Sequence, residues 1–239
     1  MEQVDVILTG GTVVTMNAQM DVIFDGAVAV RGTEIVAVAT AEAISAAYEA
    51  AEVVSCSGKY VLPGLVNAHT HVPMTLLRGL ADDLRLDVWL IGYVMPTERE
   101  FVSPEFCRLG TKLACAEQIR SGITTFADMY YYEADVARAT AEAGMRGVLG
   151  QTILKFPAPD AESYEESLAY ARAFIEEWRG HPLITPAVAP HAPYSSTPEM
   201  LRRVTELALE FDVPVLIHIA ETRQEIEDHL AQFETTVVP

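Results

Sequence analysis

The sequence is poor in cysteine and in basic residues. Three cysteines occur in 239 residues, at Cys56, Cys107 and Cys115, and no two of them form a CxxC pair. This spacing argues against a disulfide framework and against a thiolate zinc site, so we expect free, buried thiols. Sixteen Lys and Arg face 34 Asp and Glu, for a net charge of -18. Because phosphate binding needs clustered basic charge, nucleic acid is not an expected partner.

Long apolar runs are also missing. No stretch reaches about 18 apolar residues without a charge, and the opening MEQVDVILTGG lacks a basic segment followed by an apolar one. We therefore expect a soluble, cytoplasmic protein with no membrane partner. With half of its residues hydrophobic, the chain can bury a sizeable core in one large or two smaller domains.

Residues 1–62 carry short apolar segments separated by glycine. The expected strands are VDVILTGG, TVVTM, GAVAVRG, EIVAVA and, after a short Ala-rich helical piece, EVVSCSGKYVLP. Short strands at regular spacing predict a small sheet or part of a β-sandwich.

The pattern changes at Pro63-Gly64, and residues 63–239 alternate between strands and helices. The expected strands are GLVNAH, ITTFADM, RGVLGQTIL, LITPAVAPHAP and PVLIHIAET, each followed by a helical stretch. This alternation predicts an α/β fold with a parallel sheet. Five βα units are five of the eight that close a TIM-like (β/α)8 barrel, so we expect a partial barrel. An open doubly wound sheet is the alternative from pattern alone.

Two helix starts are marked in the sequence. Ser103-Pro104-Glu105 and Thr197-Pro198-Glu199 each offer a capping hydroxyl, a proline at the first helical position and an acid in the first turn. The helix from about Pro104 is expected to bury one apolar face, made of Leu109, Leu113, Ala116 and Ile119.

Histidines follow two of the expected strands. His69 and His71 stand two residues apart at the end of GLVNAH, so both side chains face the same side, and His218 ends the fifth strand. Active sites of parallel α/β barrels gather at these strand ends. Three neutral imidazoles suit zinc, although iron and manganese also fit nitrogen ligands. The alternatives are a chance pair in a loop and a histidine of the core.

Taken together, several segments resemble the amidohydrolase superfamily. They are PGLVNAHTHVPMTLLRG, DVWL, GITTFADM, PHAPYSS and IHIAET, in this order. The resemblance is to the 5-methylthioadenosine/S-adenosylhomocysteine deaminases and the related chlorohydrolases of that superfamily. It implies that residues 1–62 add strands to a composite β-sandwich and that residues 63–239 are the first part of a metal-dependent hydrolase barrel. It also implies a homo-oligomer.

The resemblance assigns roles to individual residues. It makes His69, His71 and His218 ligands of a divalent metal, most simply zinc, and Glu221 the group that protonates the substrate ring. From the residues alone, Glu221 can equally be a solvated glutamate that favours the dipole of the helix after it.

Three further residues match substrate-binding positions. Trp89 and Glu98 match positions that hold the sugar end of a nucleoside, and His191 matches a substrate-contacting histidine. Their alternatives are packing under a loop, a solvated acid and a turn residue. Asp128, at the end of ITTFADM, is expected to support the catalytic face. One departure is clear: some deaminases have an arginine after the third barrel strand, where this sequence reads Leu149-Gly150-Gln151.

The activity implied is hydrolytic deamination of an adenine-ring nucleoside such as S-adenosylhomocysteine or 5-methylthioadenosine. The alternatives are a chlorohydrolase, another amidohydrolase of heteroaromatic rings, and an inactive metal-binding or scaffolding fragment. The family completes its site with a histidine after the sixth strand and an aspartate after the eighth, and no residue here matches either. We therefore expect the site to be completed by a portion in cis or in a second chain, and this chain alone to be inactive or nearly so.

Overall fold

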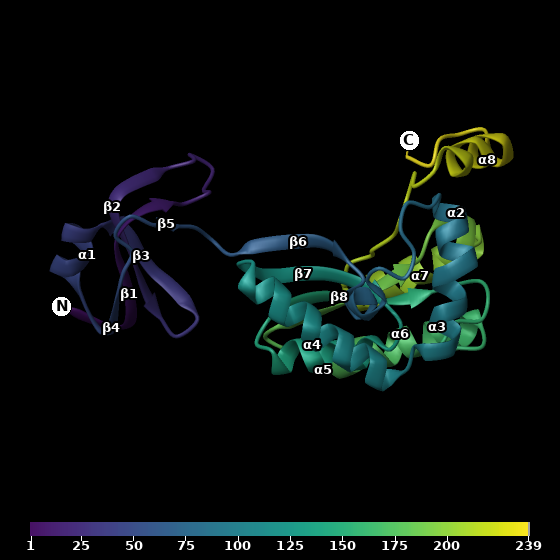
Figure 1. Ribbon diagram of the computed structural model, residues 1–239, viewed down its shortest axis with the longest axis horizontal. Coiled ribbons are helices and arrows are strands. Elements are labelled where there is room, and N and C mark those ends of the chain that lie inside the picture. The colour runs from purple at the N-terminus through teal and green to yellow at the C-terminus, as the bar shows by residue number, and fades with distance from the viewer. Residues whose placement is uncertain (239) are drawn as a thin grey trace. The chain divides into compact units, whose positions relative to one another are not determined.

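The computed structural model describes residues 1–238, which form two compact units, one from Met1 to Gly64 and one from Leu65 onward (Figure 1). Each unit has its own sheet.

The first unit is a five-stranded sheet with one helix. Four strands lie in the order β3-β2-β1-β4, and β5 pairs with the far part of β1. Its elements are β1 (Glu2–Val14), β2 (Val22–Arg31), β3 (Glu34–Thr40), α1 (Ala41–Ala47), β4 (Tyr48–Ser55) and β5 (Tyr60–Val61). Side chains of Val4, Ile7, Ala27, Ala29 and Ile44 form its core.

The first two expected strands are one strand in the structure. VDVILTGG and TVVTM run together as β1, whose pairing with β2 is irregular on both sides of Gly11. Gly10 takes a left-handed φ of 78°, and a Cβ on Gly11 would lie 2.9 Å from Cβ of Cys56. The two glycines therefore bend one strand around its neighbour, and they do not mark a turn between two strands.

The second unit is built on a four-stranded parallel sheet in the order β6-β7-β8-β9. The strands are β6 (Leu65–Thr70), β7 (Ile123–Tyr130), β8 (Arg146–Ile153) and β9 (Ile184–Pro190). The long helices are α4 (Pro104–Arg120), α5 (Glu133–Glu142), α6 (Tyr164–Trp178), α7 (Pro198–Phe211) and α8 (Arg223–Phe233). Helices α4, α5 and α6 lie along one face of the sheet (Figure 1), which confirms the expected α/β alternation.

Shorter helical pieces stand between β6 and α4 and after β9. They are η1 (Val72–Leu77), α2 (Leu86–Trp89), η2 (Leu90–Val94), α3 (Met95–Phe101) and η3 (Pro193–Ser195). The middle piece, η2, is a π-helix, and the amide of Met95 bonds the carbonyl of Leu90, five residues back. Among residues 1–238, no helix has the length and apolar composition needed to cross a membrane.

The fifth expected strand is not a regular strand. The segment 213–218 runs parallel to β9, with an isolated bridge between Val188 and Val215. Val188 donates to the carbonyl of Pro214 at 3.0 Å, and Leu216 donates to the carbonyl of Val188 at 2.9 Å. The next hydrogen bonds between the two segments would need amide hydrogens from the prolines at 186, 190 and 214, which have none. Proline therefore reduces this pairing to a few bonds.

Both marked helix starts are confirmed. The hydroxyl of Ser103 accepts a hydrogen bond from the amide of Phe106, and the hydroxyl of Thr197 accepts one from the amide of Met200, both at 3.2 Å. A proline occupies the first turn of each helix.

The expected buried face of α4 is wrong. Leu109, Leu113 and Ile119 are 59%, 41% and 51% exposed, and Ala116 is exposed as well. The buried face is instead made of smaller and polar residues: Cys107, Gly110, Thr111, Ala114, Cys115 and Gln118. A Cβ on Gly110 would lie 2.5 Å from the carbonyl oxygen of Pro73. The helix packs so closely on η1 that size, rather than apolarity, selects the buried face.

Candidate active site

Three histidines converge at the carboxyl ends of the parallel segments. His69 lies near the end of β6, His71 directly follows that strand, and His218 ends the segment beside β9. One ring nitrogen from each lies within 4.8 Å of the others, and the ring centroids are 5.0 to 5.3 Å apart. Within residues 1–238 this is the one group of three or more potential ligands that lie so close together. The donor set of three imidazoles fits a divalent metal ion, zinc in particular.

Backbone carbonyls orient two of these imidazoles. Nδ1 of His71 donates to the carbonyl of Met129 at 2.6 Å, and Nδ1 of His218 donates to the carbonyl of His191 at 2.9 Å. Each bond fixes the proton on Nδ1 and leaves Nε2 free to ligate a metal. Burial also lowers the pKa of both His71 and His218, which favours the neutral form that binds metal.

Asp128 holds the segment that carries the first two histidines. Its Oδ1 accepts hydrogen bonds from the hydroxyl of Thr70 and from the amide of Val72, both at 2.6 Å. These residues flank His71 on either side, and Asp128 is fully buried at the end of β7. Burial raises the pKa of Asp128 to about 6, against the opposing hydrogen bonds. These two hydrogen bonds are the contacts through which Asp128 can support the segment around His71.

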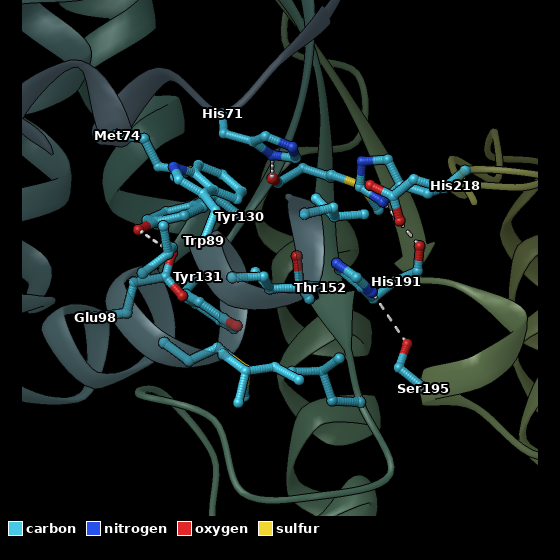
Figure 2. Close-up of a pocket in the computed structure, with 18 of the residues that line it drawn as sticks. His71, Met74, Trp89, Glu98, Tyr130, Tyr131, Thr152, His191, Ser195 and His218 are labelled. Carbon is cyan, nitrogen blue, oxygen red and sulfur yellow. Dashed lines mark hydrogen bonds between the residues drawn. The ribbon is translucent and has the colours of Figure 1, made fainter. Parts of the chain in front are cut away.

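A cavity of about 390 Å³ adjoins the histidines (Figure 2). His191 and His218 lie on one side of it, Trp89 and Glu98 lie on the other, and His71 lies between them. His69 instead lines a neighbouring cavity of about 240 Å³, and His218 lines both. The remaining walls of the larger cavity are mainly apolar and aromatic: Met74, Leu86, Leu90, Ile91, Val94, Met95, Met129, Tyr130, Tyr131, Leu154 and Phe156.

Glu98 is buried in this wall, not solvated. It is 6% exposed, and its Oε1 accepts the hydroxyl proton of Tyr130 at 2.7 Å. Burial raises the pKa of Glu98 to about 7, although the Tyr130 hydrogen bond opposes the rise. The alternative of a solvated acid is therefore wrong. Glu98 is a polar group in a mainly apolar wall, where its carboxyl group can hydrogen-bond another polar group.

The raised pKa of Glu98 predicts a pH-dependent stability. The folded state holds this proton more tightly than the unfolded state, whose pKa is near 4.5. The stabilisation is therefore complete below pH 4.5 and is lost as the pH rises through 7. At about 1.36 kcal/mol per pKa unit, Glu98 lowers the unfolding free energy by about 2 to 3 kcal/mol between pH 5 and pH 8.

Urea unfolding of Glu98→Gln at pH 5 and pH 8 measures this difference. The variant should lose that part of the pH dependence. Glu100→Gln, a change of an exposed acid two residues away, should keep it. An unchanged pH dependence in Glu98→Gln would contradict the assignment.

His191 lies beside the metal-site candidates and is partly buried. Its ring centroid is 4.9 Å from that of His218, and its Nδ1 is 3.1 Å from the hydroxyl of Ser195. Burial, together with the neighbouring imidazoles of His218 and His71, lowers the pKa of His191 to about 4. A neutral imidazole here can donate or accept one hydrogen bond toward a ligand in the cavity.

Glu221 lines the same cavity, at its exposed side. Its Oε2 accepts a hydrogen bond from the hydroxyl of Tyr194 at 2.9 Å. No local pattern marks Tyr194 in the sequence, because its partner Glu221 lies 27 residues away. Gln151 stands in the segment where some deaminases have an arginine, and it does not line the cavity. It donates to Asp160 at 2.7 Å under the sheet end.

The sequence is similar to known proteins over nearly its whole length. The pattern of the amidohydrolase family matches residues 60–238. The chain is 42% identical over 235 residues to 5-methylthioadenosine/S-adenosylhomocysteine deaminase 1 of Syntrophus aciditrophicus, which covers 97% of this chain and 53% of that protein. The chain thus spans about half the length of the curated relatives it matches.

Solved structures resemble the chain as well. A zinc-bound adenosine deaminase from Xanthomonas campestris superposes with a TM-score of 0.95 and 40% identity, over 99% of this chain and 54% of that one. A triazine hydrolase from Arthrobacter aurescens superposes with a TM-score of 0.86 at 18% identity, over 97% and 56% of the two chains. The second likeness shows the fold alone.

Proposed function

Because the chain belongs to the amidohydrolase family, we propose that it provides metal ligands and a substrate pocket for hydrolytic deamination of an adenine-ring nucleoside. The observation that carries the proposal is the convergence of His69, His71 and His218 beside a cavity that also holds Glu221. The names of the relatives favour S-adenosylhomocysteine or 5-methylthioadenosine as the substrate.

The three histidines would hold a divalent metal ion, and zinc is favoured because the similar adenosine deaminase structure contains it. Bound there, the ion would supply Lewis acidity and activate water at neutral pH. Glu221 would carry a proton to the ring nitrogen, and His191, neutral at this pH, would hydrogen-bond the reacting end of the ring. The apolar wall keeps bulk water from the ring.

The opposite side of the cavity would bind the rest of the nucleoside. Trp89 offers a flat aromatic surface, and Glu98 offers a carboxyl group able to bind the hydroxyls of a sugar. The tyrosine that bonds Glu98 fixes the carboxyl toward one orientation. A sugar bound there would lie beside Trp89 and Glu98, across the cavity from His191 and His218 (Figure 2).

The proposed site needs groups in addition to the three histidines. Among residues 1–238, no carboxylate joins the three histidines within the 4.8 Å that relates their nitrogens. We propose that the remaining ligand and a base for water come from a further portion, in cis or in a second chain. The second unit would then form part of a (β/α)8 barrel, and residues 1–62 would form part of a composite sandwich.

An ultraviolet assay for loss of the ring amine tests the function. Zinc-loaded protein would be assayed on S-adenosylhomocysteine and 5-methylthioadenosine, alone and mixed with the part of the Syntrophus aciditrophicus deaminase that this chain does not span. Ammonia release that stops on chelation and returns with zinc supports deamination. Chloride release from a chlorotriazine, without ammonia release from either nucleoside, would favour the chlorohydrolase alternative. Zinc binding without either product would favour the scaffolding alternative.

A further inference from the structure

The turn that carries Glu221 has a fixed backbone. Ala220 takes a left-handed φ of 56°, a conformation that costs energy for a residue with a Cβ. The buried carboxylate of Glu225 accepts the amide of Ala220 at 3.3 Å and the amide of Glu221 at 2.8 Å. Thr222 caps α8 by accepting the amide of Glu225 at 3.0 Å. These bonds hold the main chain of Glu221, and its side-chain torsions are the freedom that remains.

Tyr194, from a different part of the fold, restricts the side-chain torsions of Glu221. It lies in η3, after β9, and its hydroxyl donates to Oε2 of Glu221 at 2.9 Å. Its backbone is tied to the segment that follows β8, because Nζ of Lys155 donates to the Tyr194 carbonyl at 2.7 Å. Its ring also stands edge-on to His191, with centroids 5.8 Å apart. The hydroxyl therefore reaches Glu221 from a backbone that is bonded to another segment and from a ring that contacts His191.

The contact engages only one oxygen of the carboxylate. Oε2 of Glu221 accepts the hydrogen bond from the Tyr194 hydroxyl, so Oε1 is the oxygen that can exchange a proton with a ligand. Tyr194 is 41% exposed, so its side chain adds little to the core. This side chain contributes the hydrogen bond to Glu221 and part of the cavity lining.

We propose that Tyr194 is a positioning residue that holds the Glu221 carboxylate in the orientation needed for proton transfer. This inference rests on the proposed function of Glu221 and extends it. Tyr194 acts through Glu221, so its effect should appear in turnover and should vanish where Glu221 is absent.

Tyr194→Phe removes the hydroxyl and keeps the ring. In a preparation that deaminates nucleosides, kcat should fall roughly 10- to 100-fold, the size of one hydrogen bond to a charged group, and KM should change less than about 2-fold. Tyr60→Phe, a matched change of an exposed tyrosine in the first unit, should leave both constants unchanged. In a Glu221→Ala background, Tyr194→Phe should cause no further fall in kcat. Unchanged kcat in the single variant, or an equal fall in both backgrounds, would overturn the proposal.

A measurement that needs no turnover separates this inference from the proposed function. Urea unfolding of Tyr194→Phe, Glu221→Ala and the double variant should show non-additive effects on the unfolding midpoint, because each single change removes the same hydrogen bond. Additive effects would refute the positioning contact. If the parent protein releases no ammonia while the unfolding cycle is non-additive, the deaminase function fails and the contact between the two side chains stands.

Discussion

Replacing His69 by alanine is expected to lower the affinity for zinc by more than about 100-fold. Loss of a residue that hydrogen-bonds a metal ligand typically lowers the metal affinity by about 10- to 100-fold. Loss of the ligand itself should lower it more. His69 is the most exposed of the three converging histidines, so its removal disturbs packing least. Competition with a chromophoric chelator would measure the affinity, and elemental analysis would measure the zinc content.

The matched control for this substitution is His229→Ala. His229 lies on α8 and lines neither cavity, and its Nδ1 donates to the carbonyl of Thr235 at 3.0 Å. The substitution His229→Ala should leave the zinc affinity unchanged. Zinc at 100 times its dissociation constant should also stabilise the parent by about 2.7 kcal/mol, and His69→Ala should lose this stabilisation. Parent-like zinc affinity in His69→Ala would remove the metal site from the proposed mechanism.

Glu221→Gln is expected to lower kcat for deamination by about 10²- to 10⁴-fold, the usual contribution of a positioned acid or base. The amide fills the same space and still accepts the Tyr194 hydroxyl, but it cannot carry a proton. Because Glu221 lies outside the group of converging nitrogens, zinc content should remain that of the parent. Steady-state kinetics with elemental analysis of the same samples would check both parts.

Glu227→Gln provides the comparison on the same helix, because Glu227 is exposed and lines neither cavity. Its kcat should match that of the parent. If Glu221→Gln turned over as fast as Glu227→Gln, the proton-transfer role would have to be assigned to another group. A fall in zinc content in Glu221→Gln would instead mean that this residue supports the metal.

Local rules were sufficient for much of the fold. The starts of α4 and α7 follow from a hydroxyl, a proline and an acid within three residues, and these interactions form wherever the chain places them. The α/β alternation follows from the period of the apolar residues. The two-residue spacing of His69 and His71 gives both side chains the same direction, whatever packs around them.

The same local rules failed where contacts with other segments determine the structure. Leu109 and Leu113 have the spacing of a buried helix face, but the close approach of Gly110 to Pro73 turns the small residues inward. The segment 213–218 has the composition of a strand, yet the prolines opposite and within it remove the amide hydrogens that a regular ladder needs. In both places, a partner distant in the sequence determines the outcome.

The candidate site divides in the same way. The sequence by itself determined which residue types stand at the strand ends, and therefore the histidines and Glu221, because strand parity and chain order are local properties. Only the tertiary structure decided that Glu98 is buried against Tyr130, that Asp128 holds the segment around His71, and that Tyr194 reaches Glu221. These contacts join residues 27 to 58 positions apart. They depend on the packing of separate elements, because a hydrogen bond needs its two atoms within about 3 Å, a precision that no sequence spacing imposes at such separations.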